Sequence, residues 1–134
     1  MPSAIKDYGY QFSEGFDRAF LEDIYGDDSR AAEEIFHSSI CQIEQSMERA
    51  GEIMREGTTE QLRQHCHHLK PVFGYIGQLH AQGAVQRFEE LCSHVASLAE
   101  VHEAYSDLTG TISAALELVR REHLRLKEHN NRRA

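Results

Sequence analysis

Apolar side chains recur at every third or fourth position over most of this chain, and this spacing places them along one face of an α-helix. In the segment 28–56 the spacing joins Ala32, Ile35, Phe36, Ile40, Ile43, Met47, Ala50 and Met54. Only two prolines, Pro2 and Pro71, interrupt the chain, and no run of β-branched residues alternates with polar ones. The pattern therefore predicts an all-α protein.

Local start and stop signals divide the pattern into five helices. We expect a short helix over 13–24 and four long ones over 28–56, 58–77, 79–99 and 104–128. Ser13 is the expected N-cap of the short helix, with Ile24 on its buried face. Gly57 ends the first long helix. The segment from Thr58 to Gln61 matches the capping-box pattern that begins the next one.

Four amphipathic helices of about 20 residues joined by short loops predict an antiparallel four-helix bundle, with the short additional N-terminal helix covering one end. A length of 134 residues corresponds to one domain. We expect this domain over 13–129, preceded by an N-terminal tail over 1–12 whose rings, Tyr8, Tyr10 and Phe12, pack onto the bundle.

Charge and composition limit the partners and the compartment. The formal net charge of −8 disfavours nucleic acid and anionic membranes, because the chain and these polyanions repel each other. No apolar stretch approaches the roughly 20 residues that span a bilayer, and the N-terminus does not resemble a secretory signal. We expect a cytoplasmic monomer with protein or small-molecule partners. Its three cysteines, Cys41, Cys66 and Cys92, are expected to be reduced and buried.

Nine histidines raise the question of a metal site. On one helix His65 and His67 point about 160° apart and cannot share an ion. Di-iron sites in bundles use two Glu-x-x-His pairs, whereas this chain has one, which ends at His37. We therefore expect no metal. A metal-binding bundle that uses His65, His68 and either His37 or His80 remains an alternative.

Motifs for catalysis are absent from the sequence. The chain has no G-x-x-x-x-G-K-[ST] loop and no G-x-G-x-x-G turn, so no ATP site is expected. It also has no nucleophile elbow of the kind that hydrolases use. The sequence does not predict an enzyme with autokinase activity.

The helix expected from residue 58 carries an unusual group of side chains away from its buried stripe. The stripe consists of Leu62, Cys66, Leu69, Phe73 and Ile76. Measured from it around the helix, the solvent-facing sector holds Gly77 at about 60°, Lys70 at about 80°, Arg63 at about 100°, Gly74 at about 120°, His67 at about 140° and Pro71 at about 180°. Glycine costs up to about 1 kcal/mol inside a helix, so the two glycines suggest that a partner approaches closely. A cation one turn from an imidazole suits a phosphoryl group.

The spacing of these residues resembles a known signature. His67-His68-Leu69-Lys70-Pro71-Val72-Phe73-Gly74-Tyr75-Ile76-Gly77 is similar to the motif of histidine-containing phosphotransfer (HPt) domains, which is His-x-Leu-Lys-Gly followed six residues later by Gly. Phe88-Glu89 looks like the Leu-Glu pair that members often carry on the next helix. The resemblance spans about 14–128, and its specific part is eleven residues long.

The resemblance implies a phosphorelay intermediate. His67 would accept a phosphoryl group from a receiver-domain aspartyl phosphate or a hybrid histidine kinase, and would pass it to a response regulator. Lys70 would stabilise the phosphate. The resemblance implies no cofactor on this chain, with Mg²⁺ on the partner receiver only. The implied docking surface comprises Arg63, Pro71, Gly74 and Gly77.

The chain departs from the family pattern at two positions. Pro71 replaces the usual Gly and removes the N–H that would bond to the carbonyl of His67. Some members carry a Gln on the facing helix that helps to hold the phosphate, and Glu89 stands there in this sequence. A carboxylate would repel the phosphate, so Glu89 is given no role at this point. Pro71 also leaves an alternative function, a helical adaptor that binds receiver or kinase domains without being phosphorylated.

Overall fold

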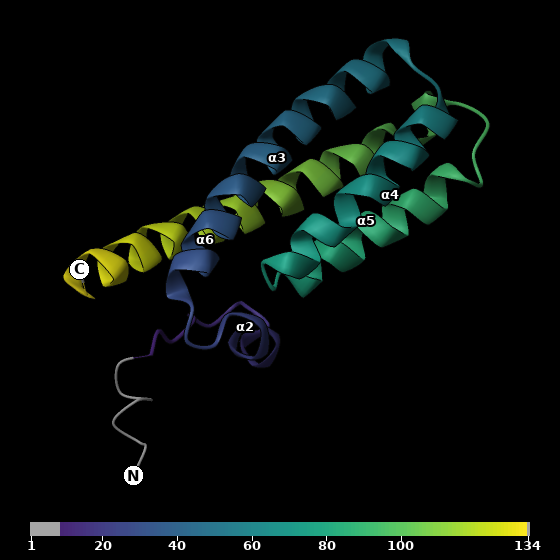
Figure 1. Ribbon diagram of the computed structural model, residues 1–134. Helices are drawn as coiled ribbons and strands as arrows, with labels where there is room; N and C mark the ends of the chain where they lie inside the picture. Colours follow the sequence, from purple (N-terminus) through teal and green to yellow (C-terminus); the bar gives the residue numbers. More distant parts are fainter. Residues whose placement is uncertain (1–8, 134) are drawn as a thin grey trace.

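The computed structural model describes residues 9–133, and every regular element within this range is a helix. The predicted all-α class is therefore confirmed. Figure 1 shows the long helices side by side and the short N-terminal helix across one end. The elements are α2 (Arg18–Tyr25), α3 (Ser29–Glu56), α4 (Thr59–Tyr75), α5 (Leu79–Cys92), the 3₁₀ helix η1 (Leu98–Val101) and α6 (His102–Arg133). Over the described residues, none of these helices combines the length and the apolar character that crossing a membrane requires.

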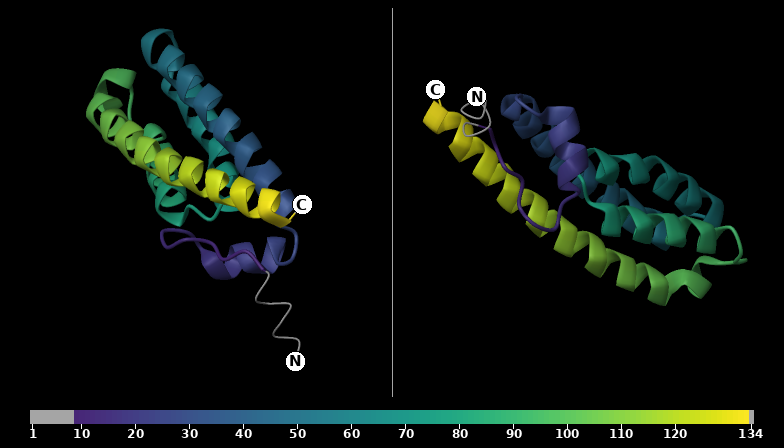
Figure 2. Two further views of the ribbon diagram at one scale, coloured as in Figure 1. Left: turned by 90° about the vertical axis from the view of Figure 1, so that its left-hand side faces the viewer. Right: turned by 90° about the horizontal axis from the view of Figure 1, so that it is seen from below.

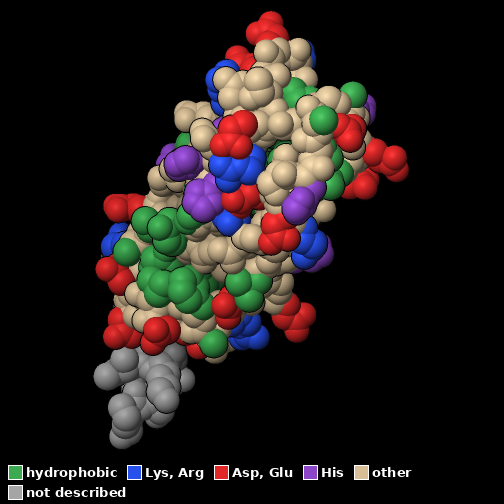
Figure 3. All heavy atoms as spheres, turned by 90° about the vertical axis from the view of Figure 1, so that its right-hand side faces the viewer, with side chains coloured by type: hydrophobic (Ala, Val, Ile, Leu, Met, Phe, Trp, Pro, Cys, Tyr) green, Lys and Arg blue, Asp and Glu red, His purple; other side chains and the backbone are tan. Residues whose placement is uncertain are grey.

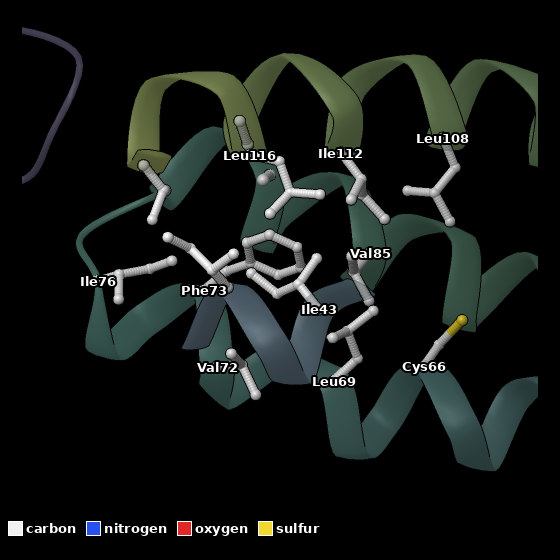
Figure 4. Close-up of a cluster of buried hydrophobic side chains, with 14 of the residues drawn as sticks. Ile43, Cys66, Leu69, Val72, Phe73, Ile76, Val85, Leu108, Ile112 and Leu116 are labelled. Atoms are coloured by element: carbon white, nitrogen blue, oxygen red, sulfur yellow. The ribbon is translucent and has the colours of Figure 1, made fainter. Parts of the chain in front are cut away.

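The long helices pack in pairs around a shared apolar core. α3 and α5 each contact both α4 and α6. The buried stripe predicted for α4 is confirmed, since all five of its residues are at most 5% exposed. Figure 4 shows Ile43 of α3, Phe73 of α4, Val85 of α5 and Ile112 of α6 converging in this core. Each such side chain contributes about 1.5–3 kcal/mol when fully buried.

The beginnings of α3 and α4 follow the capping signals in the sequence. The side chain of Asp28 accepts a hydrogen bond from the backbone N–H of Ala31 at 3.0 Å. The predicted capping box of α4 is complete: Thr58 Oγ1 accepts from the N–H of Gln61 at 3.1 Å, and Gln61 Oε1 accepts from the N–H of Thr58 at 3.0 Å. These bonds satisfy N–H groups that have no partner inside the helix.

The short N-terminal helix differs from its prediction. α2 begins at Arg18 instead of Ser13, and its N-cap is Asp17. Between Ser13 and Arg18 the backbone leaves the helical range at Gly15, which has φ +94°, and Ser13 donates its backbone N–H to Glu122 of α6 at 2.9 Å. Ile24 is 50% exposed, whereas Leu21 of α2 is fully buried. In a helix as short as α2, packing against the rest of the bundle determines which side chains are buried.

Two long helices also differ from prediction at their ends. α5 stops at Cys92 instead of 99: the hydroxyl of Ser93 donates to the carbonyl of Glu90 at 2.6 Å, and Ser97 and Glu100 form a second capping box that begins η1. α6 continues to Arg133, beyond the expected end at 128. Cys41 is exposed, which corrects the expectation of three buried thiols. Cys66 and Cys92 are buried, and burial raises the pKa of Cys66 to about 12 and that of Cys92 to about 11.

The N-terminal segment lies along the C-terminal part of α6 (Figure 2). Tyr10 donates its hydroxyl to Oε2 of Glu122 at 2.8 Å. Phe12 is 4% exposed and stacks on Phe36 with ring centroids 6.0 Å apart. These two rings pack as expected, and Tyr8 lies outside the described residues. Residues 10–12 therefore belong to the folded part of the chain.

Candidate functional site

The exposed side of α4 carries the imidazole that the sequence singled out. The buried stripe of α4 faces the core, so the His67 side chain, on the other side of the helix, is 61% exposed. α4 continues through Pro71, which is also exposed. Figure 3 shows the face over α4 and α5, where histidine side chains lie beside basic and acidic ones and hydrophobic side chains gather toward the α2 end.

Glu89 of α5 is the centre of the site. It is only 9% exposed. Its Oε2 lies 3.0 Å from Nδ1 of His67, and its Oε1 lies 2.6 Å from Nζ of Lys70. Nη1 of Arg63 is 4.0 Å from Oε2. Glu89 has no role in the prediction from sequence, although its place in the Phe88-Glu89 pair on the facing helix is a signal that points to it.

The charge state of Glu89 follows from these contacts. Burial raises the pKa of the Glu89 carboxyl, but hydrogen bonds from Lys70 and His67 outweigh burial and hold that pKa below its ordinary value. Glu89 is therefore ionised at neutral pH and can only accept hydrogen bonds.

An ionised Glu89 determines the tautomer of His67. Because both oxygens of the carboxylate are acceptors, Nδ1 of His67 must carry the proton that lies between the two groups. In the neutral ring, Nε2 then keeps its lone pair. Among residues 9–133, no hydrogen bond or ion pair engages Nε2. The site thus presents a basic nitrogen on an exposed ring.

Lys70 is held by α5. Its Nζ donates to Oε1 of Gln86 at 2.6 Å and forms the ion pair with Glu89. The Lys70 side chain is 18% exposed, against 61% for His67. The ammonium is thus directed at the carboxylate that holds the imidazole.

Arg63 lies one turn before His67 at the edge of the site. Its Nε and Nη2 donate to the two carboxylate oxygens of Glu60 at 2.9 and 2.6 Å. This pairing leaves the Arg63 side chain 32% exposed. Arg63 is therefore partly exposed at the edge of the site, with part of its charge balanced by Glu60.

The two glycines of the motif have different surroundings. A Cβ on Gly74 would lie 2.8 Å from Nε2 of Gln82, so the amide of Gln82 fills the space that Gly74 leaves. Gly77 is buried, with φ +68°. Its carbonyl accepts from the N–H of Asp17 at 2.8 Å. The placement of Gly77 in the docking surface is therefore corrected: the helical angle assumed that the helix reached residue 77, but α4 ends at Tyr75.

A groove of about 500 Å³ lies beside Lys70 between α4 and α5. Its lining residues are Lys70, Pro71, Leu79, Gln82, Gly83 and Gln86. Leu79 and the nearby Tyr75 are each 56% exposed. A partly apolar surface therefore adjoins the charged cluster around Glu89, with Lys70 at the boundary of the two.

His65, His68 and His37, which the metal alternative would use, each have another contact. Among the residues that the structure describes, no three His, Cys, Asp or Glu side chains are arranged to hold an ion. Nε2 of His65 donates to the carbonyl of Ser46 at 2.7 Å, and Nδ1 of His68 donates to the carbonyl of Gln64 at 2.7 Å. His37 pairs instead with the ring of a histidine on α6, at 5.4 Å between centroids.

No protein-family model, curated protein or solved structure matches this chain. Its function is therefore inferred from the geometry of the site and from the motif on α4.

Proposed function

We propose that this protein is a phosphorelay intermediate of the HPt type that carries a phosphoryl group on His67. The observation that carries the proposal is the exposed imidazole whose Nδ1–H is held by a buried carboxylate at 3.0 Å, while Nε2 faces solvent. This is the arrangement that a nitrogen nucleophile needs, because it combines the correct tautomer, a restrained ring and open access.

The arrangement of the helices supports the same proposal. We interpret α3 to α6 as an antiparallel four-helix bundle and α2 as the short additional helix at one end, with residues 13–129 as the HPt-like domain. The proposal places the protein in the cytoplasm as a monomer. A response regulator or a hybrid histidine kinase would supply the receiver domain.

The transfer of the phosphoryl group to His67 needs no separate base, because no proton has to leave Nε2. The lone pair of Nε2 attacks the phosphorus of the receiver's aspartyl phosphate, and the P–O bond to the aspartate breaks with its electron pair leaving on the carboxylate. The new N–P bond makes the ring a cation that keeps its proton on Nδ1, facing Glu89. In the second transfer, a carboxylate of the next receiver attacks the phosphorus and the electron pair of the N–P bond returns to Nε2.

Glu89 is the positioning residue of this mechanism. A ring cation next to a carboxylate is stabilised, and the neutral imidazole that leaves in the second transfer is a better leaving group than an anion. The concern that Glu89 repels phosphate is reduced by geometry, because Glu89 binds Nδ1 and the phosphoryl group would sit on Nε2.

The surface beside His67 suits a receiver domain. Receivers of this kind present an acidic pocket that holds Mg²⁺, and the resemblance assigns that ion to the partner. Arg63 and Lys70 would attract the acidic pocket, while Pro71 and the groove that reaches Leu79 would supply the apolar contact. Lys70 is also the cation that the motif assigns to the phosphoryl group.

The experiment is phosphotransfer from a panel of radiolabelled, phosphorylated receiver domains to the wild type, His67→Gln and His68→Gln. His68 is a matched control, since it is the neighbouring exposed histidine and its Nδ1 is bound to a backbone carbonyl. We expect acid-labile, base-stable label on the wild type and on His68→Gln only. Label on His67→Gln would refute the assignment. Receiver binding that is unchanged in His67→Ala, with no transfer to the wild type, would establish the adaptor function instead.

A further inference from the structure

We infer that Lys70 controls acceptance of the phosphoryl group through Glu89, by keeping His67 singly protonated. This inference rests on the proposed function and gives Lys70 a positioning role in the unphosphorylated protein. It differs from direct contact with the phosphoryl group, which is the role that the motif implies.

The contacts form a chain that alternates between the two helices. Gln86 of α5 accepts from Lys70 of α4 at 2.6 Å, Lys70 lies 2.6 Å from Oε1 of Glu89 on α5, and Oε2 of Glu89 lies 3.0 Å from Nδ1 of His67 on α4. Gln86 is oriented in turn, because its Nε2 donates to Glu90 at 2.9 Å and so directs Oε1 toward Lys70. The chain therefore ends at the nucleophile.

In this series of contacts, Lys70 is the positive charge that balances the negative charge of Glu89. The titratable groups around Glu89 and His67 are Arg63, Cys66, His68 and Lys70 from α4, and Glu90 and Cys92 from α5. Burial raises the pKa of both thiols well above neutrality, so they are uncharged. Arg63 is 4.0 Å from Glu89 and is bound to Glu60. Lys70 is thus the cation within hydrogen-bond distance of Glu89.

Removing Lys70 would leave the Glu89 charge to act on His67 alone. A carboxylate beside an imidazole favours the doubly protonated ring, because opposite charges attract. A doubly protonated ring has no lone pair on Nε2 and cannot attack phosphorus. Lys70 offsets this attraction, and Glu89 can then hold the Nδ1 proton without drawing a second proton onto the ring.

The first test is the pH dependence of transfer from a phosphorylated receiver to the wild type, Lys70→Met, Lys70→Arg and Lys127→Met. Lys127 is an exposed lysine of α6 and serves as the control. For Lys70→Met we expect the acid side of the rate profile to move upward by about one pH unit, the usual size of an effect from one neighbouring charge. Because Lys70 also lies in the proposed docking surface, each profile is scaled to its own alkaline maximum before the acid limbs are compared. Lys127→Met should keep the wild-type profile, and Lys70→Arg should keep the wild-type position of the acid limb. An acid limb of Lys70→Met at the wild-type pH would overturn the inference and leave Lys70 with a direct role at the phosphoryl group or in docking.

The second test needs no phosphotransfer. ¹⁵N NMR of the His67 ring in unphosphorylated protein reports which nitrogens carry protons. At neutral pH we expect the fraction of His67 rings that carry a proton on both nitrogens to be larger in Lys70→Met than in the wild type. The same protonation in both proteins would refute the role of Lys70 and leave the phosphocarrier proposal intact. The expected NMR difference without transfer from any receiver would refute the carrier instead.

Discussion

Gly77→Ala distinguishes a structural role of this glycine from the docking role that its place in the motif implied. Gly77 has φ +68°, and an alanine in this left-handed conformation costs about 1 kcal/mol. The added Cβ would lie 2.9 Å from Cδ1 of Leu21 and 3.1 Å from the backbone nitrogen of Asp17. Moving α2 to relieve this crowding costs about 1–3 kcal/mol more. We therefore expect a loss of about 3 kcal/mol of unfolding free energy.

Thermal and urea unfolding measure this loss directly. For a domain of this size, about 3 kcal/mol lowers Tm by about 10 °C. Gly110→Ala is the matched control. Gly110 lies inside α6 with no atom within 4 Å of an added Cβ. Alanine should therefore stabilise α6 there, by about 0.5–1 kcal/mol.

Gly77→Ala should lower stability without changing receiver binding. Below its lower Tm, Gly77→Ala should bind receivers like the wild type, because Gly77 is buried away from the exposed face of α4. The structural account is refuted if Gly77→Ala is as stable as the wild type. It is equally refuted if the folded variant loses receiver binding.

Two further predictions concern buried polar groups. Asn130 is 2% exposed and forms hydrogen bonds with Ser29 and Glu33 of α3. Asn130→Ala should therefore lower the unfolding free energy measured in urea by about 3 kcal/mol, while substitution of the exposed neighbour, Asn131→Ala, should change it by less than about 0.5 kcal/mol. Equal effects of the two substitutions would contradict the role of these hydrogen bonds. Glu89→Gln should cost stability at neutral pH. Because the native pKa of Glu89 is lowered, the carboxylate contributes stability above the ordinary Glu pKa and loses it as the pH falls through the native value. The wild type and Glu89→Gln should therefore converge in stability as the pH falls from the ordinary Glu pKa through the lower native value, and a gap that persists in stronger acid would argue against the ion pair.

Much of the secondary structure followed from local signals in the sequence. The capping box at Thr58 was correct because a cap needs only residues within one turn. The end of α5 was wrong because apolar spacing continues past Cys92, although Ser97 and Glu100 begin a new helix there. α2 was wrong at its start because Gly15 has φ +94° and breaks the helical path after Ser13, whose backbone N–H bonds to Glu122, more than 100 residues away.

The candidate site was predicted in part. His67 and Pro71 are exposed as the helical angles indicated, since both angles are measured within α4. Gly77 lies beyond the end of α4, so its angle had no meaning there. The role of Glu89 was missed because the sequence shows a carboxylate near an expected anion but not the ring nitrogen to which it is bound.

The sequence by itself determined the helical class, the buried stripe of α4 and the exposure of His67, because periodicity and capping depend on residues three or four positions apart. Only the tertiary structure decided which ring nitrogen of His67 carries the proton. That choice depends on placing Glu89 of α5 within hydrogen-bond distance of α4, and a distance between side chains on two helices is determined by how the helices pack.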